Sequence, residues 1–221
     1  MDEELNPWPK KGDQLFKSGI GDWSNACLNF TSDQFSLYAT GYKRAGDLLV
    51  KHIEGTNSNQ DILIYPIAFL YRQYLELQLK DIIIKGNILF DIHEPYPQHH
   101  RLNTIWTNCR RIIENLKESE SIREEIEATE DYIQQFSKID PYSMAFRYPT
   151  DKENKCSLPD VERISIVNLK NIMSGIANFL DATGMILSVE LEFKWQSEAI
   201  NDEFNRMAEE EFGAFFNDGD F

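Results

Sequence analysis

The chain has 221 residues, enough for one domain with appended segments, and 42% of them are hydrophobic, enough for a substantial core. Its 22 basic and 37 acidic residues give a net charge of −15, which repels nucleic-acid phosphate, so we do not expect nucleic acid as a partner. Three widely spaced cysteines, a polar N-terminus and the absence of an uninterrupted apolar run of about 20 residues predict a reduced, cytoplasmic protein without a membrane span.

The first half of the chain alternates between turn-forming and helix-forming segments. Residues 1–30 are interrupted by proline and glycine and predict an irregular arm. Apolar residues at helical spacing then predict a helix over 32–54. After a polar loop, a second helix is predicted over 61–85, and Gly86 is expected to end it.

Two more helices follow a proline-containing loop. A period of three to four apolar residues predicts a helix over 100–117. Ser121 and Glu124 form a capping-box pattern, which predicts the start of a charged helix that ends at about residue 138.

Residues 140–166 have no helical period and contain three prolines, so they predict a small β-hairpin or an irregular loop. In the hairpin, the strands would be 146–148 and 162–166. Asn168 is expected to cap a further helix, which would end near residue 188.

Together these elements predict a mainly α fold, a single bundle of five to six helices. The predicted organisation is an N-terminal arm over 1–30, a helical domain over 31–190 and an acidic, phenylalanine-rich segment over 191–221.

Three charged residues on the second helix carry the strongest functional signal. Arg72, Glu76 and Lys80 are spaced four residues apart, so they form one stripe on a helix that is otherwise apolar. Buried charges are unfavourable unless they are paired, so we expect the three to be inside the protein, with Glu76 central. They form either the polar floor of a ligand pocket or a structural ladder of ion pairs.

The loop after the charged helix offers a second candidate. Arg147 lies between Phe146 and Tyr148, and the Asp140-Pro141 turn would direct this loop. An arginine held by aromatic rings can bind carboxylate or phosphate, so Arg147 and Asp140 join Arg72, Glu76 and Lys80 as candidate ligand-binding residues. Alternatively, Arg147 pairs with Glu76 or Asp140 and fixes the loop.

The histidines suggest acid–base chemistry more than metal binding. The residues Asp91, Glu94, His99 and His100 match no known pattern of ligand spacing, so we expect neither a metal nor a cofactor. His100 opens a helix and could act as an acid–base group or serve in capping. No common nucleophile or nucleotide-binding motif is present.

The C-terminal segment combines acidic residues with phenylalanines. From Ala199 to Phe221 it contains seven acidic residues, one basic residue and five phenylalanines. It predicts either a last amphipathic helix, with Phe204, Met207 and Ala208 facing the body, or a peptide that docks into a partner. The candidate partner-binding residues are Phe212, Phe215, Phe216 and Phe221.

Several short motifs occur together in one order. They are Tyr71-Arg72-Gln73, Glu76-Leu77 and Lys80, then His100-Arg101-Leu102, then Asp140-Pro141 through Phe146-Arg147-Tyr148-Pro149. This pattern, over about 32–185, resembles HEPN-type helical proteins of bacteria and phages, which are often found in defence or toxin–antitoxin contexts. The resemblance implies a helical bundle that forms a dimer and acts in phage–host conflict.

The chain departs from the ribonucleases of that family. Those members carry an arginine followed four to six residues later by a histidine, whereas here Arg44 precedes His52 by eight. We therefore expect a non-catalytic HEPN-like protein that engages a protein partner, a second copy or a small anionic ligand. The alternatives are an acidic inhibitor that mimics nucleic acid and a metal-independent RNase-like enzyme that uses Arg72, Glu76, His100 and Arg147.

Overall fold

The computed structural model describes the chain in two compact units, Met1–Gln34 and Phe35–Phe221. The described residues are 8–9, 11–12, 14–19, 21, 23–117 and 119–217, with side chains as far as residue 210. Up to residue 33, the described part of the first unit consists of turns, bends and irregular backbone, and Asn25 accepts a hydrogen bond from the Gly19 amide at 3.2 Å.

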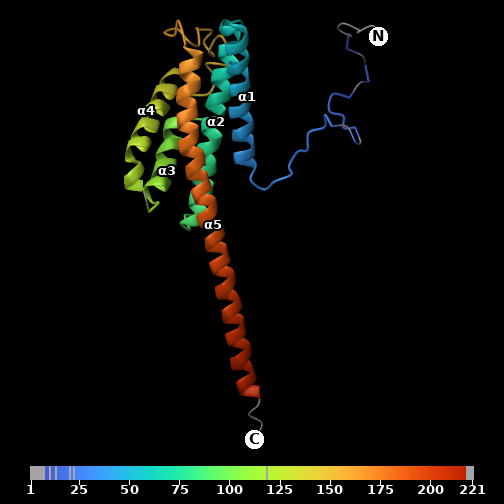
Figure 1. Ribbon diagram of the computed structural model, residues 1–221, viewed down its shortest axis with the longest axis vertical. Helices are drawn as coiled ribbons and strands as arrows, with labels where there is room; N and C mark the ends of the chain where they lie inside the picture. Colours follow the sequence, from blue (N-terminus) through green and yellow to red (C-terminus); the bar gives the residue numbers. More distant parts are fainter. Residues whose placement is uncertain are drawn as a thin grey trace. The chain divides into compact units, whose positions relative to one another are not determined.

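The second unit is a helical bundle, so the predicted mainly α fold is confirmed (Figure 1). Its elements are α1 (Gln34–Thr56), α2 (Gln60–Leu89), α3 (Leu102–Glu114), the 3₁₀ turn η1 (Ser119–Ile122), α4 (Arg123–Ile139) and α5 (Ile166–Asn217). The described residues contain five α-helices and no strand.

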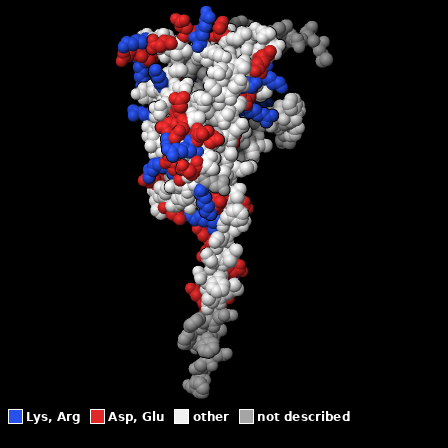
Figure 2. Space-filling model, turned by 60° about the vertical axis from the view of Figure 1, so that its left-hand side comes forward, with Lys and Arg blue, Asp and Glu red and all other residues white. Residues whose placement is uncertain are grey.

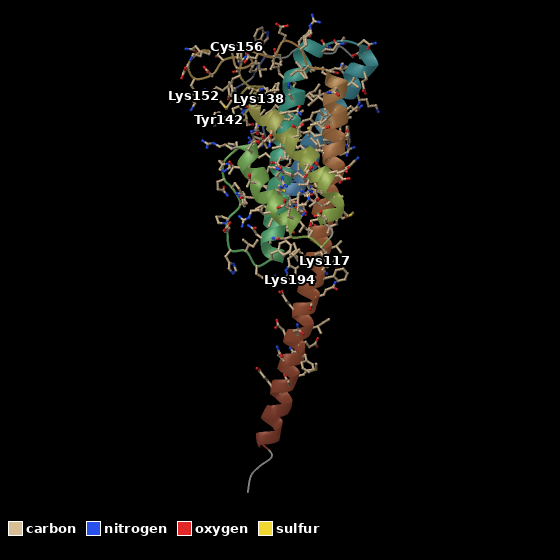
Figure 3. All side chains as sticks on the ribbon, turned by 90° about the vertical axis from the view of Figure 1, so that its left-hand side faces the viewer. Lys117, Lys138, Tyr142, Lys152, Cys156 and Lys194 are labelled. Carbon is tan, nitrogen blue, oxygen red and sulfur yellow. The ribbon has the colours of Figure 1, made fainter. Side chains whose placement is uncertain are left out.

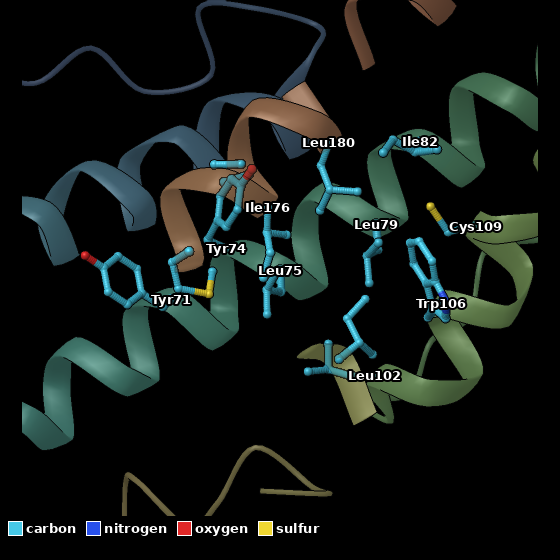
Figure 4. Packing of buried hydrophobic residues seen from close by; sticks show 14 of the residues in the cluster. Tyr71, Tyr74, Leu75, Leu79, Ile82, Leu102, Trp106, Cys109, Ile176 and Leu180 are labelled. Carbon is cyan, nitrogen blue, oxygen red and sulfur yellow. The ribbon is translucent and has the colours of Figure 1, made fainter. Parts of the chain in front are cut away.

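The centre of the bundle is α2, which explains why this helix is apolar nearly all the way round. It packs against α5 and α3, and α4 packs against α3. Figure 4 shows Leu75 and Leu79 of α2 beside Leu180 of α5 and Trp106 of α3. The core therefore lies around α2, and the polar groups on the buried stretch of α2 must be satisfied inside the protein.

Gly86 has a different role from the predicted one, because α2 continues past it to Leu89. A Cβ atom at Gly86 would lie 2.1 Å from Cγ2 of Ile112 in α3, which is far inside van der Waals contact. Glycine is therefore present because α2 and α3 approach closely there, and the prediction that it ends the helix is wrong.

The segment between α4 and α5 is an irregular loop, as one of the two alternatives predicted. The strands proposed at 146–148 and 162–166 do not form, and the one pairing in the described loop is an isolated bridge between Thr150 and Cys156. Asp140 accepts hydrogen bonds from the amides of Met144 and Ala145, so the chain curls there instead of extending.

Both ends of α5 differ from the prediction. The helix begins at Ile166, and Ser165, in place of Asn168, accepts the amide hydrogen bond at its start. It continues past residue 188 to Asn217 (Figure 1), because no proline interrupts this stretch and the core-facing stripe extends to Leu191.

The far part of α5 leaves the bundle at Lys194 (Figure 3). The Lys194 ammonium donates to the carbonyls of Ile88 and Leu89 at the end of α2, and it pairs with Asp91 at 2.5 Å. Every described side chain from 195 to 210 is exposed, so we call residues 195–217 the stem. The prediction that Phe204, Met207 and Ala208 face the body is wrong.

In the described chain, one helix is long and apolar enough to cross a membrane by length and composition, namely α5 between Ile166 and Glu210. Of its most apolar stretch, 39% is buried within the protein. The core helix of a bundle also has these properties, and the cytoplasmic location stays a prediction.

The close approach at Gly86 predicts that Gly86→Ala destabilises the bundle. The added methyl group must displace Ile112, and overpacking of a core costs about 1–3 kcal/mol, which lowers the melting temperature by about 5 °C. Thermal unfolding followed by circular dichroism measures the change.

The matched control is Gly175→Ala in α5, where an added Cβ meets nothing within 4 Å. Alanine favours a helix more than glycine does, so this variant should be as stable as the parent or more stable. Equal effects of the two substitutions would contradict the role given to Gly86.

Candidate functional site

The charged stripe on α2 is buried, and Glu76 lies at its centre, as predicted. Lys80 Nζ lies 2.8 Å from Glu76 Oε1, and Arg72 Nη1 lies 3.2 Å from Glu76 Oε2. Each partner is one helical turn from Glu76, so the three side chains satisfy one another on the same face. Whether they also bind a ligand stays a prediction.

Arg72 connects three segments of the bundle. Its Nη2 donates to the His100 carbonyl at 2.7 Å, just before α3, and its Nε donates to the Asp140 carbonyl at 3.2 Å, just after α4. The side chain is fully buried. Burial lowers the pKa of Arg72, and the carboxylates of Asp140 and Glu76 partly offset this effect. The guanidinium is thus a structural clamp with its donors engaged.

Asp140 shapes the loop that begins at the end of α4. Its Oδ1 accepts the amides of Met144 at 2.7 Å and Ala145 at 3.1 Å, which form the turn expected for Asp140-Pro141. Its Oδ2 is buried without a hydrogen bond, 3.4 Å from Arg72 Nε, because that nitrogen donates to the backbone carbonyl instead. The contact of Oδ2 with Arg72 is therefore electrostatic.

His100 is the one solvent-facing member of this cluster. Its Nδ1 lies 2.7 Å from Glu76 Oε1, and 61% of its side chain is exposed. Burial alone would raise the pKa of Glu76, but the hydrogen bonds from Lys80 and His100 outweigh burial and hold that pKa below its ordinary value. A buried, ionised carboxylate thus orients an accessible imidazole, an arrangement that suits proton transfer.

Arg147 does not join the cluster. Its Nε donates to the Ser143 carbonyl at 2.6 Å, and its guanidinium lies over the rings of Phe69 and Tyr148, 5.6 and 5.5 Å from their centroids. The expected pairing with Glu76 or Asp140 is wrong, because Arg72 and the loop amides already occupy those carboxylates. Arg147 remains exposed and has no carboxylate partner among the described residues.

A cavity beside α5 lies apart from the residues predicted to bind a ligand. A cavity of about 170 Å³ lies between α4, the 140–165 loop and α5, and its lining is mainly apolar. None of the five residues proposed to bind a ligand lines it. Within the described residues, no three His, Cys, Asp or Glu side chains gather as metal ligands would.

The exposed side of α5 carries a feature that was not predicted from the sequence. An exposed apolar stripe runs along α5 through Ile186, Val189, Phe193, Ile200, Phe204 and Met207, and we call it the outer stripe. The signal was present as spacings of 3, 4, 7, 4 and 3 residues, which repeat every one or two helical turns. The predicted partner residues Phe212, Phe215, Phe216 and Phe221 lie outside the residues whose side chains are described.

Comparison with known proteins adds no family. No family model, curated protein or solved structure matches the chain. Function is therefore inferred from two features of the molecule, the polar cluster of Arg72, Glu76, Lys80, His100 and Asp140 and the exposed face of α5.

The polar cluster predicts that Glu76→Gln destabilises the protein strongly. Glutamine keeps the shape but removes the charge, so it takes away the counter-charge of Lys80 and one of the two carboxylates that balance Arg72. Breaking a buried pair in this way costs about 3–5 kcal/mol, which lowers the melting temperature by about 10 °C. Glu127→Gln, in an exposed pair with Arg123, is the control and should have little effect.

The same variant has a pH signature. Since the folded-state pKa of Glu76 is lowered, its stabilising contribution is present above the unfolded value of about 4.3 and is lost as pH falls through the folded value. The stability gap between wild type and Glu76→Gln should therefore narrow below about pH 4. A gap that stays constant down to pH 2 would argue against an ionised Glu76.

Proposed function

We propose that this chain is a non-catalytic binding protein of HEPN-like build that engages a protein partner through α5. The observation that supports the proposal is the outer stripe, with Phe193, Ile200 and Phe204 each more than 60% exposed. Large apolar side chains gathered on one exposed face of a helix are uncommon in water and mark interaction sites. A component of a defence or toxin–antitoxin system is the context that the resemblance implies.

The stem also favours the proposal, because its described side chains do not pack against any other described part of the chain. Helices in proteins are stabilised mainly by packing an apolar face, and the described side chains from 195 to 210 are all exposed. A partner laid on the outer stripe would supply that packing. The buried charges of Arg72, Glu76 and Lys80, by contrast, are paired within the bundle, as those of a structural element are.

A second candidate function is enzymatic, and the Glu76–His100 pair favours it. The imidazole is held by a buried carboxylate and remains accessible, as a general acid or base requires. Arg147, exposed and fixed over two rings, could bind a small anion nearby. The RNase-like alternative needs Arg147 beside His100, and no contact between the two is found in the described chain.

We expect the purified protein not to cleave single-stranded RNA in the absence of metal ions. The Arg–His pair of the family's ribonucleases is missing, and Glu76 is engaged by Arg72 and Lys80. A fluorogenic RNA assay in EDTA measures this directly. Cleavage by the wild type that His100→Ala abolishes would contradict the non-catalytic proposal and support the enzyme.

The proposed interaction predicts position-dependent photo-crosslinking in the cell that makes the protein. A photo-reactive phenylalanine analogue in place of Phe204 should give one discrete crosslinked protein, because Phe204 lies on the outer stripe. The same analogue in place of Asp202, on the other side of the stem, should not give that product.

The second control is a variant of the stripe itself. In the protein that carries the analogue at position 204, Ile200→Asp should remove the crosslink. Asn201→Asp adds the same charge outside the stripe, so the crosslink should remain. Identical products at both analogue positions, or no product at either, would count against partner binding through the outer stripe.

A further inference from the structure

The distribution of charge around α5 identifies the kind of partner that fits the outer stripe. At about 100° per residue, Ile186, Val189, Phe193, Ile200, Phe204 and Met207 fall within an arc of about 60°. This arc lies roughly opposite the core-facing residues Leu180, Leu187 and Leu191. The stripe is thus a second apolar face, distinct from the one that the bundle covers.

One edge of the stripe is acidic. Glu192, Glu203 and Glu210 follow one another at intervals of 11 and 7 residues, so they form a row along one edge, and Glu190 lies on the other edge. Residues 190–210 contain seven carboxylates and two cations, Lys194 and Arg206. Figure 2 shows the stem as an uncharged surface with carboxylates at its sides.

We propose that the outer stripe binds an amphipathic helix whose apolar face is flanked by Lys or Arg. Two packed helices bring the residues that flank their apolar faces close together, so the charges there decide which partner is accepted. A basic flank would meet Glu192, Glu203 and Glu210, whereas a second copy of α5 packed antiparallel would bring this row of carboxylates against the same row of its partner. From Ile186 to Met207 the stripe is about 32 Å long, so it accommodates a partner helix of about six turns.

The proposal rests on the proposed function, that α5 binds a protein, and adds the chemistry of the partner. The probes are three synthetic 25-residue helical peptides with the same leucine face and with Lys, Gln or Glu at the flanking positions. Their affinity for the full chain is measured by fluorescence anisotropy at low and moderate salt. The Lys-flanked peptide should bind at least about ten-fold more tightly than the Gln-flanked one, and the Glu-flanked one least.

The net charge of the whole chain would also attract a basic peptide, so two matched variants separate local from overall charge. Glu192→Lys/Glu203→Lys/Glu210→Lys reverses the edge, and Glu198→Lys/Asp202→Lys/Glu209→Lys reverses the face opposite the stripe. Each replaces three negative charges with three positive ones and so changes the net charge from −15 to −9. The variant with the reversed edge should no longer prefer the Lys-flanked peptide. The variant with the reversed opposite face should bind that peptide with an affinity within about three-fold of the wild type's.

The outcomes separate the two proposals. Three results would overturn the proposal of a basic partner helix and leave the proposed function standing, provided that the Phe204 crosslink persists. They are an equal loss of the preference for the Lys-flanked peptide in both triple variants, equal binding of all three peptides, and binding of none of them. Self-association through the stripe, seen by sedimentation and removed by Ile200→Asp, would also overturn it in favour of a second copy. Absence of the crosslink from position 204 when the stripe is otherwise unchanged would overturn the proposed function.

Discussion

The bundle depends on one buried guanidinium. Arg72 reaches from the middle of α2 to the carbonyls that precede α3 and follow α4, so a single side chain fixes where two other helices meet the central one. Its charge is unfavourable in the core unless it is balanced, and Glu76 and Asp140 supply the balance. The rest of the polar cluster follows from that requirement, because Glu76 in turn is shared with Lys80 and His100.

This constraint bears on function. Each of the three nitrogens of Arg72 donates one hydrogen bond inside the protein, two of them to the backbone beside α3 and α4, which favours the structural interpretation of this fully buried side chain. His100 is the exception, since one ring nitrogen contacts Glu76 and most of its side chain faces water. The outer stripe on α5 differs from Arg72, because its apolar side chains are exposed and no described residue covers them.

The part of the fold that could be predicted from sequence is the part set by periodicity and by the energetics of burial. Charges at positions 72, 76 and 80 on an apolar helix had to be inside and paired, and they are. The role of Gly86 could not be predicted, because it depends on how closely α3 approaches, and that distance is set by tertiary packing. The position of Arg147 was missed for a related reason, since Asp140 is occupied by its own loop. The length of α5 was underestimated because the core-facing stripe ends long before the helix does.

The ammonium of Lys194 marks the boundary between the covered and the uncovered parts of α5. With a rise of about 1.5 Å per residue, Met207 stands about 20 Å past that point along the helix axis. A molecule seated near Met207 is therefore beyond van der Waals reach of His100 and Arg147, which belong to the bundle. The far end of the outer stripe and the His100 imidazole are thus separate places on the protein, and a group at one does not touch a group at the other.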